Sequence, residues 1–322
     1  MYKIKLILTF NRDFLIKQYL LNINLLYKYR MGIGTSLLYP VWSRNQEDFI
    51  CRIMTYNVEW GFLKLPNDVT RDSCGNTLPH TPLAQNRHLI LISKNIGIVN
   101  PEICFLQEMG SIDAVKYVAD QLRSMFNLDY SVYYSNSGQG YQGVGLLIKT
   151  SLVPYCTVEK IPNFMLNRAI GIRFTIAGKE YKIAGLHLKS LYDHNYKKDI
   201  PEQLSQIAAV NDWINDTENA IICGDFNNIF GSTTIKKMSD YGYIDILETG
   251  AYIPSIMETK NTEFNGKDGK EQGSRIDYIF TSKSVTALSG HIINFIRENK
   301  HAPDFERKET SDHLPLLGIF KF

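Results

Sequence analysis

The fold of this chain is constrained most by a succession of short apolar segments that runs from residue 50 to the last residue. The segments are rich in Ile, Val, Phe and Tyr and are bounded by Gly, Pro or Asn, which is typical of β-strands. They are residues 51–58, 102–108, 144–149, 171–177, 181–188, 220–226, 275–282 and 316–322. The turn-like pair Gly178-Lys179 separates two of them and predicts an antiparallel hairpin.

Two amphipathic helices are expected between these strands. Residues 111–126 carry an apolar stripe behind Ser111, a good N-cap residue, and residues 201–215 begin with Pro201, which a first helical turn tolerates. The stripe of the second helix is Leu204, Ile207, Ala208 and Ile214. Helices together with a hairpin favour an α+β fold over a purely parallel sheet. We expect an α/β sandwich of two mixed, largely antiparallel sheets, packed face to face with helices outside. Residues 66–87 and 259–274 are expected to be long polar loops.

Composition fits a globular protein, because 44% of the residues are hydrophobic and only 21% are charged. The 35 Lys and Arg nearly balance the 33 Asp and Glu, which excludes a histone-like polycation. Binding of a polyanion would therefore need local basic clusters or a bound metal ion. The five cysteines are irregularly spaced without a Cys-x-x-Cys pair, so we expect reduced thiols and neither a disulfide framework nor a zinc knuckle.

The first 50 residues are expected to form an N-terminal extension of unknown role, followed by one catalytic domain over residues 51–322. The first thirty residues are basic and contain Asp13 as the single acid, which suits an organelle presequence, a membrane-surface helix or a simple extension. The apolar patch Leu6 to Phe10 is too short for a signal peptide, and no stretch is long enough to span a membrane. An intracellular location without an obligate protein partner is therefore expected.

Polar residues stand at or near the ends of several predicted strands, where a buried strand normally passes into a turn. They are Asn57, Glu108, His187, Asp225, Asn227, Asp277, Asp312 and His313. Each one alone is readily explained as a turn, a cap or a structural histidine. Their recurrence on separate strands favours a common site, since burying a carboxylate beside apolar residues is costly unless a metal, a cation or hydrogen-bond donors compensate.

This set of side chains indicates metal-assisted hydrolysis of a phosphate ester. Carboxylates and a carboxamide without thiolates suit Mg²⁺ or Mn²⁺, and histidines can pass protons to phosphoryl oxygens near neutral pH. The sequence contains no His-Glu-x-x-His motif, no Gly-x-Ser-x-Gly elbow and no P-loop. A zinc hydrolase, a serine hydrolase and a nucleoside-triphosphate-driven motor are therefore disfavoured.

The ordered segments TYNVEW, FLQE, HLKS, GDFNN, RIDYIF and SDHLPL resemble the signature of the endonuclease/exonuclease/phosphatase superfamily, whose members are deoxyribonuclease I-like. The resemblance covers residues 51–322. It implies that Asn57 and Glu108 hold a divalent cation and that Asp312 is a further ligand or lies next to the ligands. Family membership alone does not give the substrate.

The resemblance also implies catalytic roles. Asp225 would orient or deprotonate the attacking water with help from Asn227, which would also contact the phosphate. His313 would bind a phosphoryl oxygen or transfer a proton, with its tautomer fixed by Asp277. His187 would donate to the phosphate from the other side.

Nuclease members are the favoured branch of the family. AP endonucleases carry Tyr-x-Pro-Asn where this chain has His187 and its neighbours, and the Trp-Cys-Asp-Arg signature of 5-phosphatases is replaced by residues 274–278. Basic residues assigned to substrate binding are Lys189, Lys197, Lys198 and Arg275. Rings interleave with these lysines after His187, which suits a nucleic-acid backbone, although a solvated loop explains them equally well. A phosphatase, a lipid or inositol phosphate hydrolase and an inactive binding member remain the alternatives, and DNA versus RNA and endo- versus exonuclease action stay open.

Overall fold

The computed structural model divides the chain into two units, residues 1–45 and 46–322. It describes residues 49–64, 82–135, 142–176, 178–191, 196–248, 260–263, 272–293, 311 and 313–322. The predicted N-terminal extension lies outside these residues apart from its last two positions, and its boundary and role stay predictions. All that follows concerns the second unit.

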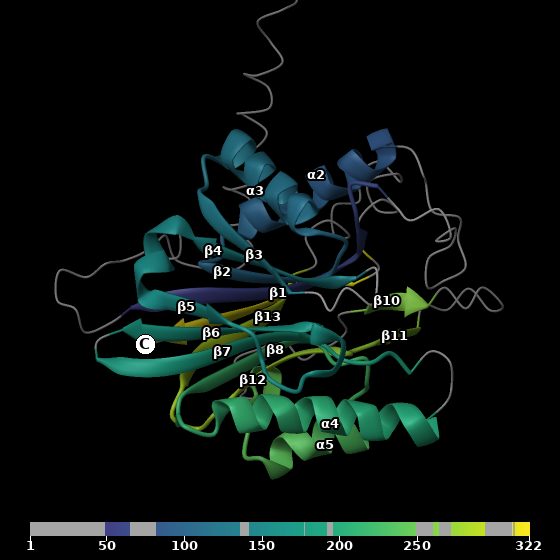
Figure 1. Cartoon of the computed structure of the whole chain (residues 1–322), viewed down its shortest axis with the longest axis vertical. Helices are drawn as coiled ribbons and strands as arrows, with labels where there is room; N and C mark the ends of the chain where they lie inside the picture. Colours follow the sequence, from purple (N-terminus) through teal and green to yellow (C-terminus); the bar gives the residue numbers. More distant parts are fainter. Residues whose placement is uncertain are drawn as a thin grey trace, which may run out of the picture. The chain divides into compact units, whose positions relative to one another are not determined.

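Apart from one separate two-stranded pair, the described strands form two six-stranded sheets that face each other (Figure 1). The first has the order β13-β14-β1-β2-β4-β3 and the second the order β5-β6-β7-β8-β12-β9. The first sheet consists of β1 (Ile50–Gly61), β2 (Ile103–Met109), β3 (Tyr130–Ser135), β4 (Gly143–Lys149), β13 (Thr286–Ile292) and β14 (Leu316–Lys321). The second consists of β5 (Cys156–Glu159), β6 (Ala169–Ile176), β7 (Lys179–His187), β8 (Ala220–Asp225), β9 (Ile244–Asp245) and β12 (Asp277–Thr281).

Both sheets are mixed. β1 pairs in parallel with β2, and β7 pairs in parallel with β8, whereas the other pairings in the two sheets are antiparallel. The predicted hairpin is present as β6 and β7, which pair from Ala169↔Leu186 to Ile176↔Lys179. Gly178 takes a φ of 73° in this turn, a conformation that glycine adopts without steric cost. The predicted sandwich of two mixed, largely antiparallel sheets is therefore confirmed.

Helices cover the outer face of each sheet (Figure 1). α2 and α3 lie over the first sheet, and α4 and α5 lie over the second. Their bounds are α2 (Pro82–Val99), α3 (Ile112–Phe126), α4 (Tyr196–Ile214) and α5 (Thr233–Asp240). The shorter elements are η2 (Thr150–Tyr155), η3 (Met165–Asn167), η4 (Ile246–Glu248) and the two-stranded pair β10 (Lys260–Glu263) and β11 (Gln272–Ser274).

The two sheets share one apolar core. Ile53 and Phe105 from the first sheet belong to the same buried cluster as Ile183 and Ile221 from the second. The sheets approach closely at Gly185, where an added Cβ would lie 1.9 Å from the ring of Phe105. This packing holds the ends of β1, β2, β7 and β8 in fixed relative positions.

Several local predictions need correction. Ser111 caps α3 as expected, with its Oγ accepting from the Ala114 N–H at 3.1 Å. Pro201, however, lies inside α4, because this helix begins earlier, at Tyr196. Residues 82–87 were predicted to end the first loop, but they form the start of α2. The sequence did not predict this helix because its apolar stripe is weak. β10 and β11 lie within the second predicted loop. The described cysteines are free, as predicted.

Candidate active site

Strand register in the second sheet brings three of the predicted residues together. His187 ends β7 and is paired with Asp225, which ends the parallel strand β8. Asp277 begins β12 and is paired with Asp225 from the other side. Neighbouring residues in register project to the same face of a sheet, so all three side chains lie at one edge of the sandwich.

The first sheet supplies the other half of the site. Asn57 in β1 stands in register with Gln107 in β2, so Glu108 follows directly beyond it. Glu108 has a φ of 63°, a left-handed conformation that is unusual for a residue with a side chain. His313 is tied to the same place, because its N–H donates to Ser311 Oγ at 3.0 Å and Ser311 donates to the Asn57 carbonyl at 2.6 Å.

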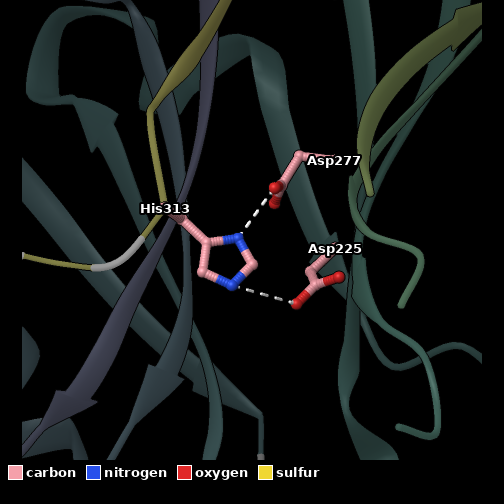
Figure 2. Close-up of side chains that lie close together, drawn as sticks. All are labelled: Asp225, Asp277 and His313. Carbon is pink, nitrogen blue, oxygen red and sulfur yellow. Dashed lines mark hydrogen bonds and ion pairs between the residues drawn. The ribbon is translucent and has the colours of Figure 1, made fainter. Parts of the chain in front are cut away.

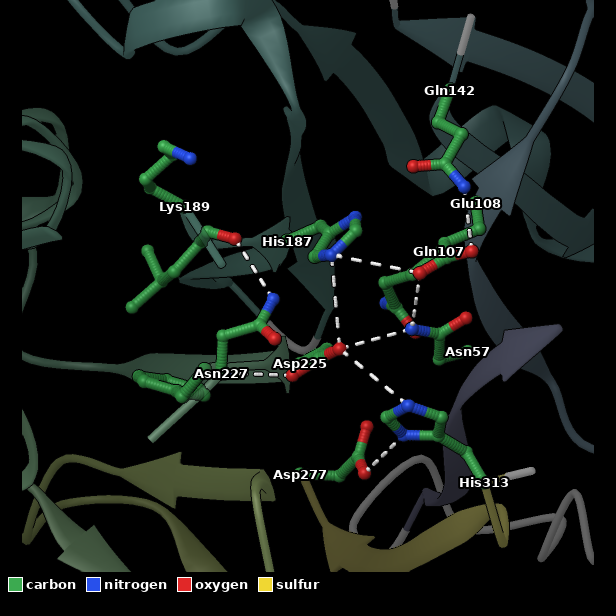
Figure 3. A network of polar contacts seen from close by, with 12 residues as sticks. Asn57, Gln107, Glu108, Gln142, His187, Lys189, Asp225, Asn227, Asp277 and His313 are labelled. Atoms are coloured by element: carbon green, nitrogen blue, oxygen red, sulfur yellow. Dashed lines mark hydrogen bonds and ion pairs between the residues drawn. The ribbon is translucent and has the colours of Figure 1, made fainter. Parts of the chain in front are cut away.

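One oxygen of Asp225 is the centre of this arrangement (Figure 3). Asp225 Oδ2 accepts from Asn57 Nδ2 at 2.9 Å and lies 3.7 Å from His187 Nε2 and 3.9 Å from His313 Nε2. The other oxygen, Oδ1, accepts from the Asn227 N–H at 2.7 Å. Four residues that are far apart in the sequence therefore surround one buried carboxylate.

His313 and Asp277 form a hydrogen-bonded pair next to Asp225 (Figure 2). His313 Nδ1 lies 2.7 Å from Asp277 Oδ2, which orients the ring and leaves Nε2 facing Asp225. Ligand atoms of Asp225, Asp277 and His313 all lie within 4.8 Å of one another, so this cluster is one candidate for holding a cation. Because His313 Nδ1 and Asp277 are already hydrogen-bonded to each other, we favour a role for this pair in proton transfer over a role as metal ligands.

Glu108 lies on the other side of Asn57 from Asp225. Its Oε1 accepts from Asn57 Nδ2 at 3.1 Å, and its Oε2 accepts from Gln142 Nε2 at 2.6 Å and from the Trp60 N–H at 3.3 Å. His187 Nε2 is 4.0 Å from Oε1. Neutral donors thus orient this carboxylate toward the site. Gln142 was missed by the sequence analysis because it precedes β4 outside any motif.

Burial perturbs two of the titrating groups. It raises the pKa of Asp225 to about 7, and the charge of Asp277 adds to the increase, while His313, the Asn227 N–H and Asn57 oppose it. Burial also lowers the pKa of His187 well below its usual value, assisted by the positive charges of Arg168 and His313. His187 is therefore neutral at pH 7, and its buried Nδ1 has no hydrogen-bond partner among the described residues.

Arg168 is a second residue that the sequence analysis missed. It is half-buried just before β6, and its backbone carbonyl accepts from the His187 N–H at 2.8 Å. Its guanidinium makes no hydrogen bond or ion pair with any residue that the structure describes. A cation in this position beside His187 is suited to binding an anion.

The remaining predicted residues are more scattered. Lys189 is half-buried directly after β7, whereas Lys197 and Lys198 are exposed on α4. Arg275 is buried, pairs with Asp245 and lies with its guanidinium 4.5 Å from the centre of the Tyr278 ring. Asn227 Nδ2 donates to the Leu188 carbonyl at 3.0 Å. Asp312 lies outside the described residues, and the substrate-binding roles of the basic residues stay predictions.

The donor set fits a hard divalent cation. Glu108 and Asp225 offer carboxylate oxygens on either side of Asn57, and no Lys or Arg side chain of the described ranges pairs with Asp225. Asn57 presents Nδ2 to both carboxylates while its Oδ1 accepts from the Glu59 N–H at 3.0 Å, so its role as a metal ligand stays a prediction. Burial and the nearby charge of Asp277 raise the pKa of Asp225, and a bound cation would oppose both effects by stabilising the ionised carboxylate.

Comparisons with known proteins agree with this geometry. Residues 54–313 match the model of the Endonuclease/Exonuclease/phosphatase family. No curated protein sequence matches the chain. None of the described helices is long and apolar enough to cross a membrane.

Solved structures share the fold at low sequence identity. Truncated Caenorhabditis elegans TDP2 is 19% identical with a TM-score of 0.55, and the match covers 86% of this chain and 99% of that one. D. rerio TDP2, solved with a single-stranded DNA product, is 20% identical with a TM-score of 0.58 over 84% and 98%. ANGEL2, a 2′,3′-cyclic phosphatase, is 16% identical with a TM-score of 0.57 over 85% and 95%. At these identities the likeness establishes the fold.

Proposed function

The chain belongs to the endonuclease/exonuclease/phosphatase family of phosphoester hydrolases, and we propose that it is a phosphodiesterase that depends on Mg²⁺ or Mn²⁺ and cleaves nucleic acid. The observation that carries the proposal is the convergence of Asn57, His187 and His313 on one oxygen of Asp225, with Glu108 beside them. Charge neutralisation and positioning are the main requirements for breaking a phosphodiester bond, and this set of groups supplies both.

Glu108 would hold the cation, and Asn57, which donates to both Glu108 and Asp225, would fix the two carboxylates beside it. A divalent cation bound there would withdraw charge from a phosphoryl oxygen and lower the barrier to attack. Asp225 would accept the proton of the attacking water. Burial raises the pKa of Asp225 in the metal-free protein, and a cation beside it would lower that pKa, so the carboxylate would be ionised and able to take the proton near neutral pH.

The two histidines would act on the phosphate in different ways. His187 is neutral and would donate an N–H to a phosphoryl oxygen without bringing a charge. His313 is held by Asp277 through Nδ1, so its Nε2 would bind a phosphoryl oxygen or transfer a proton. Asn227, fixed by its contacts to Asp225 and Leu188, would complete the wall around the phosphate.

Features around the site support nucleic acid as the substrate. Arg168 and Lys189 flank His187 and would contact the phosphate backbone, as would Lys197 and Lys198 on α4. Phe230 has 62% of its surface exposed and follows Asn227 by three residues; the Arg275 guanidinium lies 5.9 Å from the centre of its ring, and the exposed part of the ring would stack on an unpaired base. The DNA-bound D. rerio TDP2 is consistent with the same substrate class.

A phosphatase is the second candidate, because ANGEL2 has the same fold. The experiment that separates the candidates is a panel of single-stranded and double-stranded DNA, RNA, a 2′,3′-cyclic phosphate end, inositol phosphates and sphingomyelin. Each substrate is incubated with purified protein and Mg²⁺, Mn²⁺ or EDTA, and with Asp225→Asn as a matched control. Metal-dependent cleavage of DNA or RNA by the unaltered protein, without cleavage by Asp225→Asn, supports the proposal. Turnover of only the small phosphoesters, or of no substrate, would contradict it.

A further inference from the structure

Helix α4 buries two glutamines against the site. Gln203 and Gln206 are both 0% exposed, although Leu204 and Ala208, part of the expected apolar stripe, are only half-buried. A buried carboxamide costs free energy unless its hydrogen bonds are made inside the protein. The contacts of these two side chains therefore show which neighbouring segments α4 holds in place.

Gln203 bridges the loop after β8 and the segment after β7. Its Nε2 donates to the Lys189 carbonyl at 2.7 Å and reaches the Phe226 and Asn227 carbonyls at 3.3 and 3.5 Å. Its Oε1 accepts from Thr234 Oγ1 at 2.8 Å and from Asn228 Nδ2 at 3.0 Å. Both ends of this amide are thus satisfied, and one end faces the site.

Gln206 holds the same segment from the next turn of the helix. Its Oε1 accepts from the Lys189 N–H at 2.9 Å. The main-chain N–H and carbonyl of Lys189 are therefore both fixed by side chains three positions apart on α4, which lie on one face of a helix. This is a precise anchor for a residue that belongs to no helix or strand.

The two anchored segments carry site residues. Leu188 and Lys189 continue from His187, and the Leu188 N–H donates to the Asp225 carbonyl at 2.9 Å. Asn227 has a φ of 48°, a left-handed conformation that needs support from its surroundings. The structure gives that support through Asn227 Nδ2 to Leu188 and through Gln203.

We propose that Gln203, assisted by Gln206, is a positioning residue that sets His187 and Asn227 against Asp225 for reaction. The proposal rests on the proposed function, in which those three side chains surround the phosphate. Gln203 touches none of the reacting atoms and acts through the backbone of Lys189, Phe226 and Asn227. Misplacement of reacting groups by about 1 Å costs on the order of 10²-fold in rate.

The test compares Gln203→Met with Thr234→Val. Gln203→Met keeps the length of the side chain and removes every hydrogen bond to the two segments. Thr234→Val removes the bond to the Gln203 Oε1 and the bond from Asn228 Nδ2, and it leaves the contacts of Gln203 to Lys189, Phe226 and Asn227 in place. A purely structural network would make the two variants alike once both are folded.

Hydrogen exchange by mass spectrometry and steady-state kinetics are measured at a temperature at which all three proteins are fully folded. Gln203→Met should exchange faster in residues 186–191 and 225–229, and its kcat should fall about 10- to 100-fold. KM and the Mg²⁺ concentration for half-maximal rate should change less than about threefold, because Glu108 is not disturbed. Thr234→Val should keep kcat, and exchange in residues 186–191, within about twofold of the unaltered protein.

Unchanged exchange in the two segments of Gln203→Met, or an unchanged kcat in an active protein, would overturn the proposal. Equal kcat losses in the two folded variants would overturn it as well. Hydrogen exchange can be measured without turnover. A protein that is inactive on every substrate would therefore refute the proposed function, and the exchange rates would still decide whether Gln203 holds the two segments.

Discussion

Replacing Asp225 with asparagine should stabilise the metal-free protein at high pH while it abolishes catalysis. Folding raises the pKa of Asp225 from 3.8 to about 7, so the folded state binds the proton more tightly than the unfolded state. Stability from this group is therefore complete at low pH and is lost as the pH rises from about 4 to about 7. A shift of about three units corresponds to about 4 kcal/mol, of which about 2 to 3 kcal/mol falls between pH 5 and pH 8.

The carboxamide in Asp225→Asn would not titrate, but it cannot accept from both Asn57 Nδ2 and the Asn227 N–H, and losing one of these bonds costs about 1 kcal/mol at every pH. Of these two contributions, only the ionisation of Asp225 depends on pH. The advantage of Asp225→Asn in unfolding free energy should therefore grow by about 2 to 3 kcal/mol from pH 5 to pH 8. For a domain of this size that is about 3 to 5 °C in Tm.

The assay is thermal and urea unfolding of both proteins in EDTA at pH 5, 6, 7 and 8. Asp240→Asn, an exposed substitution on α5, is the control and should change Tm by the same amount at each pH. Added Mg²⁺ at pH 8 should raise the Tm of the unaltered protein more than that of Asp225→Asn. A constant difference between Asp225→Asn and the unaltered protein across the pH range would refute the argument that this carboxylate is buried without a compensating cation.

Further predictions concern the other groups. His313→Ala should lower the rate about 10²–10⁴-fold in a protein that still folds, and its Tm should fall modestly because the buried Asp277 loses a hydrogen bond. Kinetics and melting of the same preparation measure this. Loss of activity only with a collapsed Tm would make His313 structural. EDTA should remove turnover, and Mg²⁺ or Mn²⁺ should restore it. Glu108→Gln should raise the metal concentration needed for half-maximal rate. Full activity in excess chelator would exclude the metal site. The double variant Lys197→Ala, Lys198→Ala should bind nucleic acid with a weaker dependence on salt, because each lost phosphate contact reduces the slope of log binding constant against log salt concentration by about one unit. Binding titrations at several salt concentrations measure this slope. An unchanged slope would mean that the two lysines are only solvated surface residues.

The strand framework was predictable because strands buried between two layers consist of β-branched and aromatic residues, and turns interrupt them. Residues 220–226 and 316–322 illustrate this, since they form β8 and β14 almost to the residue. α2 was not predictable, because most of its helical stability comes from packing and its sequence shows only a weak apolar stripe. Pro201 misled the prediction of where α4 begins, because a proline marks a helix start only by tendency.

The convergence of the candidate residues was predictable where polar residues interrupt or end apolar strands. Asn57, Glu108, His187 and Asp225 all follow this rule, and the structure brings them together. Arg168 and Gln142 lie outside strands, and their position beside the site depends on how the two sheets meet. Gln203 and Gln206 lie among apolar residues of a helix, and no local pattern distinguishes them from solvent-facing glutamines. The resemblance to the family is confirmed by the match over residues 54–313.

The role of Asp225 is tested most directly by the rate of cleavage of a labelled single-stranded DNA by the unaltered protein and by Asp225→Asn in saturating Mg²⁺. We expect cleavage by the unaltered protein and a rate about 10²–10⁴-fold lower for Asp225→Asn, although the variant is at least as stable at pH 8. Equal rates for the two proteins would contradict the claim that the surrounded carboxylate of Asp225 is the centre of a hydrolytic site.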